Sequence, residues 1–362
     1  MKKIIFSGLI LSGLLIYGCR KMPDQPDNSK IKLNLPSTVI DYSHIPSPTG
    51  TMEVYYEDGT LIDNNKATIG RVLFYDKALS FNNSTACASC HFQENGFSDT
   101  KATSVGFDGI ATKRNSMPIG NLYNNVGTGY FWDTRSDNIE DMVFRPIQDH
   151  IEMGFENIAL ITEKLSNLPY YKELFKKAYG DENITTDRMR ESLGQFLFSI
   201  VNINSKFDKG QKSNFTNFTS EERDGMDLFV ENGCSSCHFI NSEFSPDGAS
   251  REKMANIGLD ERDIDIGNNH QYRIPDMRNV ALSGPYMHDG RFTSLNQVIT
   301  HYGANVKANP YLSEELKSDK KPKVPTSNYF GESQSSIVFF LNTLTDEFTT
   351  TNVRYSNPFP AK

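Results

Sequence analysis

The sequence predicts a mostly α-helical protein of two modules with long connecting loops. Apolar residues recur at spacings of three and four along several segments, and no clean alternation typical of a β-strand appears. A Cys-x-x-Cys-His motif occurs twice, once in each half of the chain. We therefore expect an N-terminal module over 51–210, a C-terminal module over 218–346 and a tail over 347–362, with a polar linker between the modules.

Helices are expected wherever the apolar residues share one helical face. In chain order these segments are 158–165, 189–200, 219–230, 294–302 and 337–344. Two of them begin with a capping box, in which Thr219 pairs with Glu222 and Ser294 pairs with Gln297. The second module therefore opens with a helix that leads into its cysteine motif, and it closes with another helix.

The first residues have the pattern of an export signal. Two lysines precede an apolar run over 4–17, which is shorter than the roughly 18–20 residues that a membrane span needs. The run ends in Leu-Ile-Tyr-Gly-Cys, which resembles a bacterial lipobox, so we expect a signal peptide over 1–18 and lipidation of Cys19. An ordinary signal with an incidental cysteine is the alternative. The stretch over 19–50 contains several prolines and is expected to be a tether.

The composition excludes two classes of protein. With 37 Lys and Arg against 45 Asp and Glu, the formal charge is −8, which argues against binding of a nucleic-acid backbone. The 24 Phe and 16 Tyr residues are too many for a disordered chain. Yet only 37% of the residues are hydrophobic, which is low for a globular protein. Something other than side chains is therefore expected to supply part of the core.

Four cysteines remain after Cys19, and they form two identical motifs. The motifs are Cys87-x-x-Cys90-His91 and Cys234-x-x-Cys237-His238. This pattern is typical of c-type haem attachment, in which two thiols bond to the vinyl groups of one haem and the following His ligates the iron. We expect one covalent haem c at each motif, and two haems also supply the missing apolar bulk.

Other uses of the four cysteines fit less well. Two disulfides do not require a His after each pair, and a thioredoxin-like redox site needs one pair near a βαβ pattern, which is absent. A four-cysteine zinc site usually has its pairs roughly 15–20 residues apart, whereas Cys90 and Cys234 are far more distant in the sequence.

Around the motifs the chain resembles the bacterial di-haem cytochrome c peroxidases and their MauG-like relatives. The matching segments are 69–76, 113–118, 131–135, 145–148, 152–154, 274–282 and 285–290. The resemblance implies two cytochrome c-like domains with a division of labour. The N-terminal haem, on His91, is then the site of peroxide reduction, and the C-terminal haem, on His238, is the electron-transfer site.

The resemblance also implies two catalytic residues. Glu152 matches the acid of the distal pocket, where a carboxylate takes a proton from one peroxide oxygen and delivers it to the other. Trp132, the only tryptophan, matches a residue that passes electrons between the haems. The alternatives are a solvated or capping Glu and a buried interface aromatic.

Two further positions carry information about the haem ligands. Tyr302 follows His288 at the spacing where peroxidases have an axial Met and MauG-like enzymes a Tyr, so the resemblance implies that Tyr302 ligates the second haem iron. The alternative is a core aromatic on a helical face. Phe107 stands where many of the peroxidases have a His ligand. Phe has no lone pair to donate, so we expect the first haem to be open in the oxidised protein.

Family members hold a calcium ion between the haems. The matching positions are Asn115, Ser283 and Pro285, whose amide and carbonyl oxygens suit a hard cation. In the same resemblance, His288 bonds a haem propionate rather than the iron.

The function expected from these residues is peroxide reduction. Electrons from a small periplasmic donor, a c-type cytochrome or a cupredoxin, enter at the C-terminal haem and pass by Trp132 to the N-terminal haem. One alternative is a MauG-like oxidase that acts on a protein residue, which Tyr302 and Phe107 favour. The other is a non-enzymatic electron carrier. The protein is expected on the periplasmic side, attached to a membrane by its lipid anchor alone, with no nucleic-acid partner and with a homodimer as one assembly.

Overall fold

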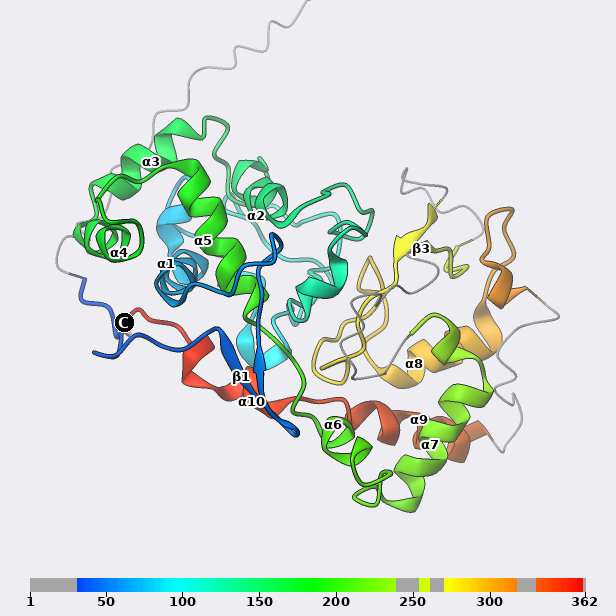
Figure 1. The fold of residues 1–362 in the computed structure, drawn as a ribbon. Coiled ribbons are helices and arrows are strands. Elements are labelled where there is room, and N and C mark those ends of the chain that lie inside the picture. The colour runs from blue at the N-terminus through cyan, green and yellow to red at the C-terminus, as the bar shows by residue number, and fades with distance from the viewer. Residues whose placement is uncertain (1–30, 239–253, 261–269, 318–329, 361–362) are drawn as a thin grey trace, which may run out of the picture.

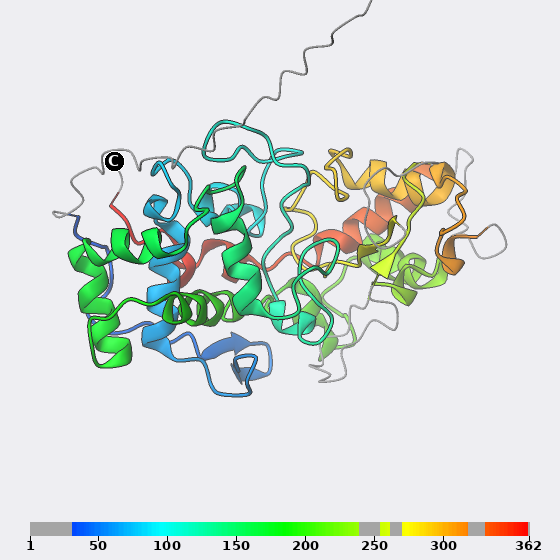
Figure 2. The same ribbon diagram turned by 90° about the horizontal axis from the view of Figure 1, so that it is seen from above.

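The structure is a computed structural model in which two bodies of helices and loops lie side by side (Figures 1 and 2). It describes residues 31–238, 254–260, 270–317 and 330–360, with the side chains of the last range from 334 onward. The expected signal peptide and Cys19 lie outside these described residues. Within them, most regular structure is helical and the strands are short, so the expectation of a mostly α-helical chain is confirmed. No helix in the described part is long and apolar enough to cross a membrane.

The first body contains five α-helices around one core. They are α1 (Asn64–Tyr75), α2 (Ile139–Gln148), α3 (Ala159–Ser166), α4 (Pro169–Tyr179) and α5 (Thr186–Phe198). Asp63 caps α1 and Thr185 caps α5 by accepting hydrogen bonds from backbone N–H groups of the first turn. Helices α1 and α5 approach closely, since a Cβ atom at Gly70 would overlap the carbonyl oxygen of Ser192.

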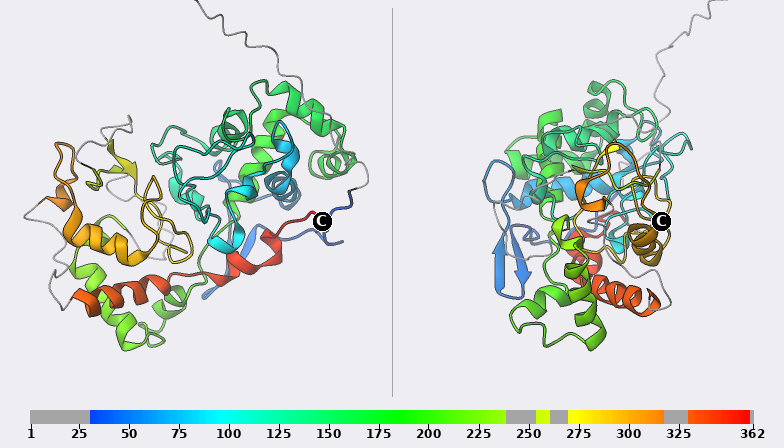
Figure 3. Two further views of the ribbon diagram at one scale, coloured as in Figure 1. Left: turned by 180° about the vertical axis from the view of Figure 1, so that it is seen from behind. Right: turned by 90° about the vertical axis from the view of Figure 1, so that its right-hand side faces the viewer.

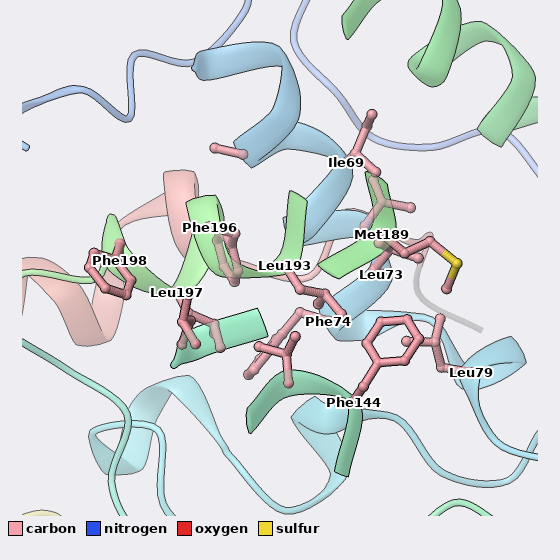
Figure 4. Close-up of a cluster of buried hydrophobic side chains, with 14 of the residues drawn as sticks. Ile69, Leu73, Phe74, Leu79, Phe144, Met189, Leu193, Phe196, Leu197 and Phe198 are labelled. Carbon is pink, nitrogen blue, oxygen red and sulfur yellow. The ribbon is translucent and has the colours of Figure 1, made fainter. Parts of the chain in front are cut away.

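Aromatic and aliphatic side chains fill the space between these helices (Figure 4). The rings of Phe74 and Phe196 lie 5.5 Å apart, and Leu73 and Leu193 are buried beside them. This core holds α1 and α5 rigidly. The loop that follows α1 carries the first cysteine motif and therefore starts from a fixed support.

The second body is built on a smaller core. Its helices are α6 (Lys206–Gln211), α7 (Ser220–Glu231), α8 (Leu295–Thr300) and α9 (Phe330–Asn342). The capping boxes expected at α7 and α8 are both present. Helix α7 packs on α9, where the rings of Phe229 and Phe340 are 5.4 Å apart and where a Cβ atom at Gly225 would overlap the carbonyl oxygen of Ser336.

The remaining elements are short. The strands are β1 (His44–Ser47) with β2 (Gly50–Glu53), and β3 (Met254–Ala255) with β4 (Tyr272–Arg273), each pair antiparallel. The 3₁₀ turns are η1 (Lys77–Leu79), η2 (Cys87–Ser89), η3 (Gln93–Asn95), η4 (Leu122–Asn125), η5 (Cys234–Ser236), η8 (Glu314–Leu316) and η9 (Val353–Tyr355). A π-helical turn, η7 (His301–Asn305), follows α8, and α10 (Glu347–Thr351) follows α9.

The expected tether is corrected over its described part. Residues 31–50 pack on the first body instead of hanging free: Tyr42 and Ile45 are fully buried there, and the N–H of Asn34 donates to the carbonyl of Pro358 at 2.7 Å. These contacts are long-range, so the prolines and the lack of helical period in this stretch gave no sign of them.

The expected tail is corrected as well. After α9 the chain returns to the first body, where Tyr355 is fully buried and its hydroxyl donates to the carbonyl of Ser199 at 2.7 Å (Figure 3). Gln93, just after the first cysteine motif, donates to the carbonyls of Thr349 and Asn352 at 2.9 Å each. The end of the chain is thus part of the support for the first motif.

The segment expected as a linker also has structure. Helix α6 begins at Lys206, and Phe207 is buried in the core of the second body. The outgoing and returning segments run together between the bodies, since the N–H of Phe207 donates to the carbonyl of Thr343 at 3.0 Å.

Candidate functional site

The first cysteine motif forms a tight turn. Cys87–Ser89 is a single 3₁₀ turn, and the N–H of His91 donates to the carbonyl of Cys87 at 3.0 Å. The His91 ring donates from Nδ1 to the carbonyl of Phe97 at 2.8 Å. A carbonyl only accepts, so Nδ1 carries the proton and Nε2 keeps a free lone pair. A histidine held in this way is oriented to ligate a metal.

The second motif repeats this geometry. Cys234–Ser236 is a 3₁₀ turn, and the N–H of His238 donates to the carbonyl of Cys234 at 2.9 Å. The His238 ring contacts the carbonyl of Pro275 through Nδ1 at 3.3 Å. Two segments far apart in the sequence therefore present a cysteine pair and a histidine in the same arrangement.

Thiols at both motifs have a raised pKa, which favours the protonated form. Burial raises the pKa of Cys87 to about 12 and those of Cys90 and Cys234 to about 11. A zinc site gathers four such side chains, and in the described residues no three His, Cys, Asp or Glu side chains come together as a metal site requires. The donor set fits thioether attachment of a haem at each turn.

Glu152 lies beside the first motif. Its charge acts on both thiols, raising the pKa of Cys87 and of Cys90. Its backbone is fixed, because its carbonyl accepts from the N–H of Phe107 at 3.0 Å and its N–H donates to Asp149 Oδ1 at 3.1 Å. The structure thus brings together the acid and the first motif.

The carboxyl of Glu152 is set for proton exchange near neutrality. Burial raises its pKa to about 7, with a further contribution from the charge of Asp149, while Arg135 opposes the shift. A general acid–base is most effective when its pKa lies near the working pH.

Phe107, whose N–H bonds to the carbonyl of Glu152, places a buried apolar ring next to this residue. It is 5% exposed and meets Phe81 edge-on at 6.5 Å. Its ring covers Gly154, where a Cβ atom would overlap it. The side chain is thus packed against protein on two sides and offers no ligand atom, as the sequence predicts.

Trp132 lies where the two bodies meet. Its indole Nε1 donates to the carbonyl of Asn115 at 2.9 Å in the first body. Its own carbonyl accepts from the N–H of Arg273 at 2.7 Å in the second body. The residue is thus fixed to both bodies at once.

Tyr302 lies beside the second motif. Its pKa is raised, mainly by burial and further by the charges of Cys234 and Cys237, so the phenol lies within electrostatic range of these thiols. It belongs to the π-helical turn His301–Asn305, not to a continuing α-helix as the apolar spacing suggests. Such turns are frequent at functional sites, because they redirect a side chain away from the regular helical face.

Comparison with known proteins places these features in one family. Residues 64–215 match the family described as "Di-haem cytochrome c peroxidase". A methylamine utilization protein MauG of Methylorubrum extorquens is 31% identical over 258 residues, which make up 70% of this chain and 72% of that protein. The chain belongs to the di-haem cytochrome c peroxidase family. The family predicted from the sequence is therefore confirmed.

Both MauG proteins and cytochrome c peroxidases are among the relatives that match this di-haem peroxidase homologue. The cytochrome c551 peroxidase of Nitrosomonas europaea is 29% identical over 293 residues, covering 78% of this chain and 80% of that protein. A solved MauG-like protein associated with microbial copper homeostasis has a TM-score of 0.67 at 26% identity and covers 90% of this chain and 98% of its own. The di-haem peroxidase of Burkholderia thailandensis shares the fold, with a TM-score of 0.63 at 19% identity over 90% of this chain and 98% of its own.

Arg273, which the sequence did not point to, supports the fit of a haem propionate near the junction of the bodies. Burial lowers its pKa to about 10, although Asp276 opposes the shift. Its Nε atom is buried and has no hydrogen-bond partner among the described residues. A buried cation with a spare donor suits the propionate of a haem. The signal available in the sequence was its place beside Ile274, at the start of a family motif.

One position expected at the calcium site, Asn115, bonds to His288, the residue expected at a propionate. Asn115 is buried, its N–H donates to the carbonyl of His288 at 2.8 Å, and its Nδ2 donates to the carbonyls of Lys101 and Ala102. The imidazole of His288 stacks on Tyr272 at 3.8 Å. Ser283 and Pro285 are also buried in the second body. Calcium at these residues stays a prediction.

Proposed function

We propose that the protein reduces hydrogen peroxide to water with electrons from a small donor protein. The reaction takes up two electrons and two protons for each peroxide and releases two water molecules. The observation that carries this proposal is Glu152, a carboxyl with a pKa of about 7 held beside the first motif. Relatives named as peroxidases support the same assignment.

Covalent haem attachment follows the two motifs. Cys87 and Cys90 attach the first haem and Cys234 and Cys237 the second, with His91, His238 and Tyr302 as iron ligands and His288 at a propionate. When bound, the haems supply irons that exchange single electrons. Nε2 of His91 and of His238 would take this role, because Nδ1 of each ring meets a backbone carbonyl.

Glu152 moves the proton that peroxide cleavage requires. In its ionised form it accepts a proton from the peroxide oxygen nearer the first motif, and it then delivers this proton to the departing oxygen. The bonds to Phe107 and Asp149 fix the backbone from which the carboxyl extends during both transfers. The apolar ring of Phe107 leaves the pocket without a competing ligand.

Trp132 lies on the proposed path of electrons from the C-terminal haem to the N-terminal haem. Electrons arrive at the C-terminal haem from a c-type cytochrome or a cupredoxin and pass by Trp132 to the N-terminal haem. The hydrogen bonds of Trp132 to Asn115 and Arg273 support this role, because they fix the indole relative to both bodies.

A MauG-like oxidation of a protein residue is the second candidate. Tyr302 favours it, because this phenol lies beside the second motif and matches the ligand of that branch. The similarity to a MauG protein agrees with this reading. A non-enzymatic carrier fits less well, since a carrier has no use for a proton-exchanging carboxyl next to a haem with an open position.

The cellular setting is part of the proposal. We place the protein on the periplasmic side, exported by residues 1–18 and attached to a membrane by a lipid on Cys19. The proposal also includes a calcium ion at Asn115, Ser283 and Pro285. It further includes a homodimer, and it includes no nucleic-acid partner.

Steady-state turnover with peroxide and a reduced c-type cytochrome tests the function. We expect Glu152→Gln to lower kcat by roughly 10²–10⁴-fold. Glu156→Gln, which changes an exposed carboxyl four residues away, serves as the control and should retain wild-type turnover. Equal turnover in wild type and Glu152→Gln would remove the proton-transfer role, and no turnover in the wild type would favour the MauG-like candidate.

A further inference from the structure

The two proximal histidines are connected by a second route that does not include Trp132. On the first body, the carbonyl of Phe97 accepts two hydrogen bonds, one from His91 Nδ1 at 2.8 Å and one from the N–H of Ile119 at 3.2 Å. The position of residues 119–121 therefore acts directly on the carbonyl that orients His91.

The route crosses to the second body at the side chain of Asp276, where the shorter of two bonds comes from Asn121. Asn121 Nδ2 donates to Asp276 Oδ2 at 3.0 Å. The residue before Asp276 is Pro275, whose carbonyl meets His238 Nδ1 at 3.3 Å. One hydrogen bond between side chains thus joins the segment that bonds to the acceptor of His91 with the segment that carries the acceptor of His238.

Burial and two hydrogen bonds hold Asn121 in its position next to Asp276. It is 4% exposed and has a left-handed backbone with φ of +52°, which Asn tolerates better than most residues. Its N–H donates to the carbonyl of Ile200 at 2.9 Å, and its Oδ1 accepts from the N–H of Asn202 at 2.7 Å. These bonds clamp Asn121 to the segment that runs between the bodies, and the side chain cannot turn away from Asp276 without losing its bond from Asn202.

The residues around this hydrogen bond are packed so closely that they cannot move to compensate for a shift of Asn121 or Asp276. A Cβ atom at Gly96, next to Phe97, would lie 2.9 Å from Cβ of Asn279 in the second body. A cavity of about 20 Å³, room for one water, is lined by residues that include Asn121 and Asp276. A shift of the segment that carries Asn121 therefore also displaces the segment that carries Asp276, and the reverse.

We propose that the Asn121–Asp276 hydrogen bond is a proximal bridge that couples the two haem ligands. The strength of the bond from a ligating histidine to its acceptor tunes the basicity of the ligand nitrogen and hence the potential of the iron. Because the bridge positions both acceptors, it links the properties of one haem to those of the other. Asn121 and Asp276 act as positioning residues. The inference rests on haem attachment at His91 and His238, and it does not depend on peroxide turnover.

A swap of donor and acceptor tests the bridge in the holoprotein. Asn121→Asp alone sets two carboxylates against each other, and Asp276→Asn alone sets two amides in conflict, because the other oxygen of residue 276 is also used by the N–H of Arg278 at 2.7 Å. The double variant restores a donor and an acceptor with the same total charge. In it, the carboxylate introduced at position 121 accepts from the N–H of Asn202 and from the amide introduced at position 276.

The readouts are the midpoint potentials of both haems and the iron–histidine stretching bands in resonance Raman spectra. We expect each single variant to shift both haems, and the double variant to return both to the wild-type values. Asn183→Asp, which adds the same charge at an exposed residue between α4 and α5, is the matched charge control and should shift neither.

Two results would overturn the bridge. One is a single variant that changes neither haem or only one, and the other is a double variant that keeps the shifts of the singles. Haem content and circular dichroism identify a variant that does not fold. Asp276→Asn then decides the question alone, because it leaves the clamp between Asn121 and Asn202 intact.

Discussion

The backbone carbonyl of Trp132 accepts a hydrogen bond of 2.7 Å from the backbone N–H of Arg273. This bond fixes the single tryptophan of one body to the second body without using its side chain. The indole is held separately, by its donation to the carbonyl of Asn115 at 2.9 Å. A substitution at 132 can therefore change the indole while the junction between the bodies keeps its backbone bond.

Trp132→Phe tests the electron route between the haems. We expect turnover with peroxide to fall at least about tenfold, an increase of about 1.4 kcal/mol in the barrier. Reduction of the C-terminal haem by the donor should keep its wild-type rate, because Phe retains the backbone bond to Arg273. Stopped-flow absorbance at the bands of each haem separates the two steps. Wild-type reoxidation of both haems in this variant would exclude Trp132 from the route.

Glu152 makes the stability of the fold depend on pH. Burial raises its pKa from 4.5 to about 7, so between these values the folded protein binds the proton more tightly than the unfolded chain. This contribution to stability is fully present below about pH 4.5 and is lost as the pH rises through about 7. Glu152→Gln should therefore gain a few °C in Tm over wild type at pH 8 and lose that advantage at pH 5.

Thermal melts of the haem-loaded proteins at the two pH values measure this difference. The matched control is Glu156→Gln, whose residue is exposed and should show no such crossover. A Tm difference between Glu152→Gln and wild type that is the same at both pH values would contradict the shifted carboxyl.

Tyr302→Met tests the second haem ligand. A phenolate favours ferric over ferrous iron relative to a thioether, so the substitution should raise the midpoint potential of the C-terminal haem. Tyr311→Met, at an exposed tyrosine nine residues further on, should leave it unchanged. A redox titration measures both, and an unchanged potential in Tyr302→Met removes Tyr302 from the iron.

Phe107→His tests the open first haem. The new imidazole stands at the family's position for a sixth ligand, so the ferric N-terminal haem should become low-spin and lose its reaction with peroxide until the protein is reduced. Phe107→Leu keeps an apolar side chain beside Gly154 and should retain the direct reaction. Electron paramagnetic resonance of the oxidised proteins reports the spin state. If wild-type protein is already low-spin at this haem, another residue fills the sixth position.

The local features of the fold were predictable from the sequence. The capping boxes at Thr219 and Ser294 are present, because the residues that form them lie three positions apart and need no distant partner. The spacing of each cysteine motif likewise sets its own 3₁₀ turn. Helix α3 begins and ends within one residue of the expected segment.

Features that depend on distant contacts could not be predicted in this way. The burial of Tyr355 depends on Ser199, and the burial of Arg273 depends on a junction between two bodies, so neither leaves a periodic pattern. The π-helical turn at Tyr302 breaks the regular spacing from which a continuous helix was expected. For Glu152, the family resemblance gave the position, but only the structure gives the burial that raises its pKa.

The central claim is that this protein reduces peroxide with electrons delivered through its own haems. Rapid mixing of the ferric holoprotein with one equivalent of peroxide, followed by excess reduced c-type cytochrome, tests it most directly. We predict an immediate spectral change at the N-terminal haem before any reductant is added, and then oxidation of two donor molecules for each peroxide. No spectral change in the ferric protein, or no donor oxidised after peroxide is consumed, would contradict the account.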